Sequence, residues 1–205
     1  MRGFILPKMQ EQRKSKILVY TVGLGCTMLA GVVIGAMIMN RAGQINNKYL
    51  SYLMESFLDG HKNGSFGMIL SFAFLSCISL QILIFLFGFS SVGAPFVVLL
   101  PFLRGIYTGV VSGYLYADMG IKGVLLNALL FWLPQVLQGV AMLIFAGQAL
   151  DMSIFLFASC FFEPQPGTRN RAQKHVKLFI FTSIFLFIIA IFESMLSGLL
   201  APVLL

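Results

Sequence analysis

The stretch Val92–Tyr116 reads VGAPFVVLLPFLRGIYTGVVSGYLY and carries both a charge and a row of glycines inside an apolar segment. It is long enough to cross a bilayer as a helix, which takes about 20 residues, yet Arg104 stands at its middle. A charge at that depth costs at least about 2.5–3.5 kcal/mol on insertion scales and is usually paired inside a bundle. A small residue then recurs at every fourth position, Gly105, Gly109 and Gly113. Because this spacing lets a neighbouring helix approach closely, the stretch predicts a central, protein-facing membrane helix.

The composition of the whole chain is typical of a membrane protein. Of its 205 residues, 59% are hydrophobic and 10% are charged, whereas a soluble domain carries about 25% charged residues. The net charge of +7 comes from basic residues beside apolar segments, as topology-setting charges do, and this argues against nucleic acid as a partner. No polar stretch is long enough for a second domain, so residues 1–205 are predicted to form a single integral membrane domain.

The first third of the chain predicts two further crossings. Residues 1–16 are basic and precede the apolar run Ile17–Met39, which exceeds the 7–15-residue core of a signal peptide. We therefore expect an uncleaved first helix with a cytoplasmic N-terminus. Within this run, Gly31 and Gly35 form a GxxxG pair suited to close packing within the chain or to homo-oligomer formation. The second crossing is predicted over Gly67–Phe89, and a short turn leads from it to the central stretch.

Between these two crossings lies the polar segment 40–66. Its apolar and aromatic residues follow helical spacing, which predicts an amphipathic helix on the outer membrane surface or against the bundle. The alternative, compatible with the first, is a docking face for an external partner. The residues expected to form that extracytoplasmic face are Tyr49, Tyr52, Glu55 and Asp59.

The segment Ile121–Phe162 is apolar over roughly twice the length that one crossing needs. It forms either two crossings or one crossing plus a re-entrant or interfacial segment. The basic loop 163–177 should be cytoplasmic by the positive-inside rule, as is the N-terminus, so an even number of crossings separates them. The segment then supplies one net crossing, with a break at Pro134 or at Gly147–Met152.

The last apolar run, Leu178–Leu200, carries Glu193 and places the C-terminus outside. The predicted fold is an all-α polytopic membrane bundle of about five transmembrane helices with a discontinuous or re-entrant region at 121–162. Arg104 and Glu193 would differ in depth by roughly 7–8 Å, which an arginine side chain largely spans. We expect them to pair or to share a polar cluster, either as a structural element or as a polar or ion pathway. The other expected members of that cluster are Asn127, Gln135 and Gln138.

Sequence signatures of catalysis and of metal binding are missing from the chain. It has no HExxH motif, no GxSxG motif and no P-loop, the patterns that would point to zinc hydrolysis, nucleophilic catalysis or nucleotide binding. Its three cysteines lie in apolar runs without a CxxC pair, and His61 and His175 fall in separate segments expected to be polar loops. We therefore expect no enzymatic activity, no cofactor and no metal site.

Several stretches together resemble the stage II sporulation protein M family of integral membrane proteins. The resemblance rests on the first run ending GVVIGAMIMN, on the central GAPFVVLLPFLRGIYTGVVSGYLY, on Leu133-Pro134, and on Glu193 with Pro202 beyond it. Many family members follow the LP pair with a histidine and a nearby glutamate. This chain departs from that pattern, with Gln135 in the first place and Gln138 and Gly139 around the second.

The resemblance implies a role rather than a reaction. In endospore-forming bacteria the family protein is similar to a membrane scaffold in a complex with two peptidoglycan hydrolases, an amidase/endopeptidase and a lytic transglycosylase. That complex drives engulfment of the forespore by the mother-cell membrane. By resemblance, this chain would be a non-catalytic scaffold at the mother-cell or septal membrane that holds the hydrolases on its outer surface. The alternative is a transporter or channel component with Arg104 and Glu193 as its intramembrane site, since broken helices such as 121–162 often build midplane sites.

Overall fold

The computed structural model describes residues 5–44, 65–126, 132–161 and 168–204. All secondary structure within these ranges is helical, and five helices are long and apolar enough to cross a membrane. They are α1 (Ile5–Gln44), α3 (Phe66–Gly88), α4 (Ala94–Leu126), α5 (Leu133–Phe161) and α6 (Thr168–Leu204). The predicted all-α membrane bundle with five crossings is confirmed.

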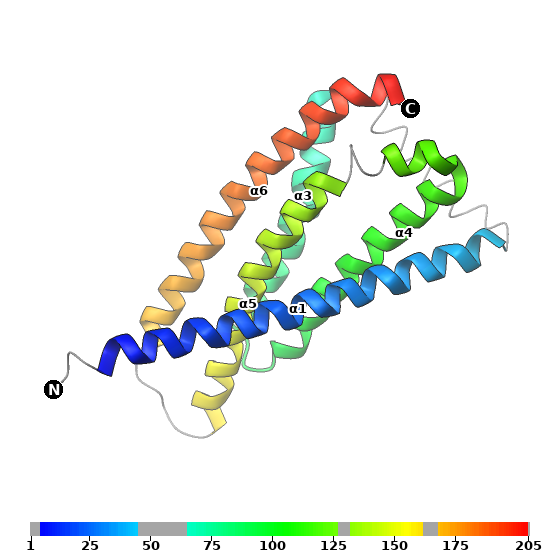
Figure 1. Ribbon diagram of the computed structural model, residues 1–205. Coiled ribbons are helices and arrows are strands. Elements are labelled where there is room, and N and C mark those ends of the chain that lie inside the picture. The colour runs from blue at the N-terminus through cyan, green and yellow to red at the C-terminus, as the bar shows by residue number, and fades with distance from the viewer. Residues whose placement is uncertain (1–4, 45–64, 127–131, 162–167, 205) are drawn as a thin grey trace.

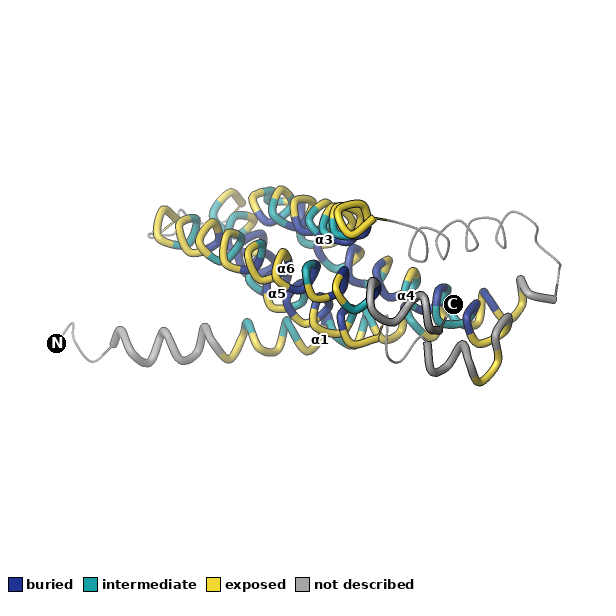
Figure 2. The backbone as a smooth tube through the Cα atoms, turned by 90° about the horizontal axis from the view of Figure 1, so that it is seen from above, coloured by how far each residue is buried: buried dark blue, intermediate teal, exposed yellow. Residues whose placement is uncertain are grey.

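Successive helices alternate in direction, so the two termini lie at opposite ends of the molecule (Figure 1). The first and third crossings, α1 and α4, therefore run the same way, and they pack along each other. Helix α5 packs against each of the other four. Seen from above, α1 forms one margin of the molecule and α3 lies toward the opposite margin (Figure 2). The arrangement places α5 at the centre.

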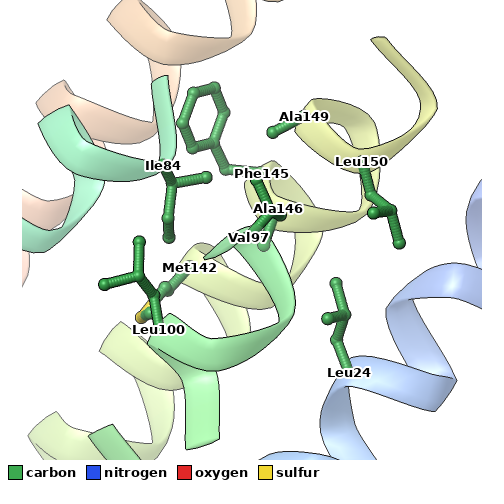
Figure 3. Close-up of a cluster of buried hydrophobic side chains, with 9 residues drawn as sticks. All are labelled: Leu24, Ile84, Val97, Leu100, Met142, Phe145, Ala146, Ala149 and Leu150. Carbon is green, nitrogen blue, oxygen red and sulfur yellow. The ribbon is translucent and has the colours of Figure 1, made fainter. Parts of the chain in front are cut away.

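Helix α5 is the most buried of the five candidate spans and α1 is the least. Small residues on α5 let neighbouring helices approach its backbone from several sides. Its apolar side chains then complete a core to which α1, α3 and α4 also contribute (Figure 3). The members of this core are Leu24, Ile84, Val97, Leu100, Met142, Phe145, Ala146, Ala149 and Leu150.

The long apolar segment 121–162 has no helix break at one of the two positions where a break was expected. Helix α5 continues without a break through Gly147–Met152, so the expected break there is wrong. The division comes earlier, because α4 bends at Gly120, whose φ of 55° and ψ of −129° favour glycine. Pro134 then stands in the first turn of α5, where its missing N–H leaves no helical hydrogen bond unmade. One crossing follows from the segment, and residues 127–131 between the helices lie outside the described ranges.

The basic segment 163–177 is also more structured than expected, because α6 already begins at Thr168. His175, expected in a polar loop, is on this helix and is fully buried. Arg169, Lys174 and Lys177 remain exposed on its first turns. The segment keeps the charge pattern of a cytoplasmic connection but contributes a buried side chain to the bundle.

Candidate functional site

The glycines of α4 and of α1 each lie against the facing helix. At four of them an added Cβ would collide with a carbonyl oxygen of the facing helix: Gly31 with Phe102, Gly35 with Ile106, Gly105 with Met28 and Gly109 with Val32. At Gly113, a Cβ would come 3.0 Å from that of Met39. The structure thus brings the five predicted packing glycines together in one surface, which we name the α1–α4 glycine contact. These glycines therefore mediate packing between two helices of the same chain.

On the other side of α4, three polar side chains join in a hydrogen-bonded cluster. The Arg104 Nη2 donates to Gln138 Oε1 at 2.6 Å, and the Gln138 Nε2 donates to Glu193 Oε2 at 2.7 Å. None of the three side chains is more than 8% exposed. They come from α4, α5 and α6, so the cluster links three helices that are distant in the sequence.

Gln138 separates the two charges. Among the described residues, Arg104 and Glu193 do not approach within ion-pair distance, and the amide lies between them. An amide oxygen accepts while its NH₂ group donates, so Gln138 presents an acceptor to the cation and a donor to the anion. The Cys77 thiol of α3 also donates to Gln138 Oε1, at 3.0 Å. Gln138 is therefore the point at which four helices meet through polar groups.

Of the other two residues predicted for this cluster, the structure describes only Gln135. Gln135 is half-buried, and among the described contacts it has no hydrogen bond to the cluster. Asn127 lies outside the described residues, as do Tyr49, Tyr52, Glu55 and Asp59 of the expected docking face. Cys77 was missed as a member, although it precedes Gln81 by one helical turn on α3. That shared face was the signal in the sequence that could have found it.

The comparison with protein families gives a match over most of the chain. The model described as stage II sporulation protein M matches residues 24–198. This chain belongs to the stage II sporulation protein M family. The match runs from the first crossing to the last and includes both the glycine contact and the polar cluster. Searches of curated proteins and of solved structures gave no match.

The family assignment and the five candidate spans identify a sporulation-related, multi-pass membrane protein. The family is generally regarded as non-enzymatic. Within the described residues, no group of three or more His, Cys, Asp or Glu side chains could hold a metal ion.

A second polar contact joins α3 to α6. The Gln81 Nε2 donates to Thr182 Oγ1 at 2.6 Å and to Ser183 Oγ at 3.2 Å, and also to the Phe179 carbonyl at 3.2 Å. Gln81 is 1% exposed, and its Oε1 has no hydrogen-bond partner among the described residues. Those residues therefore satisfy only the NH₂ half of the amide.

A third polar position lies toward the α3–α4 turn. The His175 ring stacks between Phe85 and Phe145 at centroid distances of 5.2 and 5.1 Å. Its Nε2 lies 3.4 Å from the Phe85 carbonyl, whereas its Nδ1 is buried and has no partner in the part of the chain that the structure describes. At the same end of α6, Arg171 lies 3.4 Å from Asp151 of α5. The start of α6 is thus tied to both α3 and α5.

Proposed function

We propose that this protein is a non-catalytic membrane scaffold that anchors and localises peptidoglycan hydrolases during engulfment. The family assignment over residues 24–198 carries the proposal. The partners are an extracytoplasmic amidase/endopeptidase and a lytic transglycosylase, and the site of action is the mother-cell or septal membrane. The N-terminus and the segment 163–177 are cytoplasmic, whereas the segment 40–66 and the C-terminus face outward.

The way in which the bundle holds the ends of the outer segment supports this role. Before residues 45–64, the end of α1 is packed on α4 near Met39 and Gly113. After them, the Ser194 Oγ of α6 donates to the Phe66 carbonyl at the start of α3, at 2.9 Å. A docking segment that leaves and enters the membrane at fixed points can hold a bound enzyme at a defined place on the outer surface.

A transport function is the second candidate. It is favoured by the burial of Arg104 and Glu193 inside a membrane bundle, since intramembrane charges often mark solute or ion pathways. The two candidates predict different losses. A scaffold loses hydrolase recruitment when Tyr49 or Asp59 is changed, whereas a transporter loses solute movement when Arg104 is changed and keeps recruitment.

The first experiment is cysteine accessibility from outside intact cells. A cysteine-free background is made with serine at Cys26, Cys77 and Cys160, because serine at position 77 keeps a donor for Gln138. Single cysteines are then introduced as Asp59→Cys, Gln165→Cys and Leu205→Cys. We expect an impermeant maleimide to label positions 59 and 205 but not 165. Labelling at position 165 would overturn the topology on which the docking surface depends.

The second experiment measures recruitment directly. The full-length protein is purified from cells with each hydrolase tagged in turn, and the recovered enzyme is compared between variants. We expect Asp59→Lys and Tyr49→Asp to reduce recovery at least about tenfold, the effect of losing about 1.4 kcal/mol at an interface. Gln165→Lys, a change in the opposite connection, is the matched control and should leave recovery unchanged. Equal recovery from all variants would contradict the scaffold at these residues.

A further inference from the structure

Three buried polar atoms on α3 and α6 have no hydrogen-bond partner among the described residues. They are His175 Nδ1, Gln81 Oε1 and Ser197 Oγ, on side chains that are at most 1% exposed. Leaving a buried donor or acceptor unpaired is costly, and the bilayer supplies no water from its own interior. Buried polar groups that lack a protein partner are typically bonded to internal water. The three atoms therefore indicate positions for water inside the bundle.

Two of these atoms, on His175 and Ser197, belong to α6, and the third belongs to Gln81 of α3. The buried polar residues of α6 are His175, Thr182, Glu193, Ser194 and Ser197. All but Ser194 share one face, because their separations correspond to two, three and one helical turns. The polar groups of α3 on the facing side are the Phe85 carbonyl, Gln81 and Cys77, also one turn apart. Polar groups thus recur along the α3–α6 interface, with the apolar Leu186 and Ile189 between Thr182 and Glu193.

Polar contacts join α3 to α6 directly at two levels, and Gln138 of α5 links the two helices at a third. His175 Nε2 lies 3.4 Å from the Phe85 carbonyl, and Gln81 Nε2 donates to Thr182 Oγ1 at 2.6 Å. Cys77 Sγ reaches Gln138 Oε1 at 3.0 Å, and Gln138 Nε2 reaches Glu193 at 2.7 Å. We name this set the polar column: His175, Gln81, Thr182, Cys77, Gln138 and Glu193.

We propose that the polar column, with water at its unpaired atoms, conducts protons across the membrane, and that Glu193 is its proton-binding group. A proton from water at one end binds a carboxylate oxygen of Glu193 and is released to water at the other end. The transfer oxidises and reduces nothing, and the membrane potential or a pH gradient drives it. His, Glu and hydroxyl groups are the usual parts of proton relays in membrane proteins.

The surroundings of the two titratable groups fit this assignment. Glu193 accepts a hydrogen bond from Gln138 of α5, and Arg104 and Tyr107 of α4 lie near enough to interact with it electrostatically. Because Gln138 separates Arg104 from Glu193, the carboxylate has no direct cation that would fix it in the ionised form. His175 faces aromatic rings of α3 and α5, while the nearby charges Asp151 and Arg171 are engaged with each other.

The polar column is interrupted by apolar side chains between Thr182 and Glu193. There the buried face of α6 carries Leu186 and Ile189, which pack against Cys77 and Ala141 and are at most 3% exposed. This apolar cluster separates the waters expected near Gln81 from the carboxylate. It should limit the rate, so Leu186→Thr is expected to increase proton flux about threefold or more.

The test uses the full-length protein reconstituted in liposomes that contain a pH-sensitive dye. A potassium gradient with valinomycin sets the membrane potential, and proton entry is followed as acidification of the lumen. We expect flux above that of protein-free liposomes and a loss of at least about tenfold for Glu193→Gln. His175→Phe, which keeps the ring stack, and Gln81→Leu should each give a loss of similar size.

The matched control is Gln148→Leu, an amide-to-aliphatic change on α5 outside the column, which should leave flux unchanged. Each variant is first shown to be monodisperse. If Glu193→Gln does not fold, His175→Phe and Gln81→Leu still decide the question. Liposomes no more permeable than protein-free ones, or full flux in the column variants, would overturn the proposal. The proton pathway goes beyond the scaffold role, because recruitment of hydrolases does not depend on Glu193.

Discussion

Helix α4 is held on its two sides by opposite means. Toward α1 it presents glycines whose backbone touches the backbone of the facing helix. Toward α5 it presents Arg104, which begins a chain of hydrogen bonds through Gln138 to Glu193. Two consecutive residues, Arg104 and Gly105, thus serve two different interfaces. In lipid, apolar burial alone does not drive helices together, so each interface depends on close fit or on polar bonding.

The two interfaces should differ in the substitutions that they tolerate. A backbone contact has no side chain that can move aside, so any added atom forces the helices apart. A hydrogen-bonded cluster accepts a change of similar shape but not the loss of its middle member, because two charged groups then remain buried without a partner. The following predictions test this difference.

The largest effect is expected at the glycine contact. Gly35→Ala places a Cβ against the Ile106 carbonyl and should lower the free energy of unfolding by about 3 kcal/mol, the upper end of ordinary overpacking costs. Unfolding of the purified protein in mixed micelles measures it. The matched control on the same helix is Gly23→Ala, where nothing lies within 4 Å. The control should be stabilised by up to about 1 kcal/mol through helix propensity, and equal behaviour of the two variants would contradict the contact.

The next effect is expected at the centre of the cluster. Gln138→Leu removes the bonds to Arg104 and Glu193 and the weaker bond from the Cys77 thiol. It should lower the free energy of unfolding by about 2 kcal/mol, or roughly 1 kcal/mol for each of the two bonds to a charged group. The same micelle unfolding assay applies. A triple variant that also carries Arg104→Leu and Glu193→Leu should recover part of this loss, because no charge then remains buried. A triple variant less stable than Gln138→Leu alone would show that the charges do not depend on the amide.

A smaller effect is expected where a glycine faces a flexible side chain. At Gly139 of α5, an added Cβ would lie 3.0 Å from the terminal methyl of Met28, which can rotate away. Gly139→Ala should therefore change the free energy of unfolding by less than about 1 kcal/mol. Thermal unfolding beside Gly35→Ala measures the comparison. A loss as large as that of Gly35→Ala would mean that the distance between the helix axes, rather than contact between backbones, decides which substitutions are tolerated.

The smallest effect is expected at Gln81. Gln81→Leu loses the bonds to Thr182, Ser183 and the Phe179 carbonyl, but it also removes the cost of immobilising an internal water at Oε1. The two terms offset each other, so the free energy of unfolding should change by less than about 1 kcal/mol. The same thermal assay measures it, with Gln148→Leu as the matched amide control. A large loss would show that the hydrogen bonds of Gln81 outweigh that cost.

The sequence predicts the crossings and the two charges well, because helix length and intramembrane charge are strong local signals. It does not decide which amide joins Arg104 to Glu193. Gln135 and Gln138 differ by less than one turn, and the rotation of α5 within the bundle selects between them. The bend at Gly120 is also not predictable from the sequence, since glycine adopts both regular helical conformation and positive φ. His175 looks like a loop residue until the start of α6 at Thr168 places it against Phe85 and Phe145.

The spacing of the cluster along the chain has a consequence for biosynthesis. Gln138 follows Arg104 by 34 residues, and Glu193 follows Gln138 by another 55. At about 5–20 residues per second, the ribosome delivers the amide roughly 2–7 seconds after the arginine and the carboxylate roughly 3–11 seconds later. During the first interval Arg104 belongs to a nascent chain that already holds its partner α1 but has no group to bond the guanidinium. The guanidinium of Arg104 therefore depends for its hydrogen bond on a helix that is synthesised after α4.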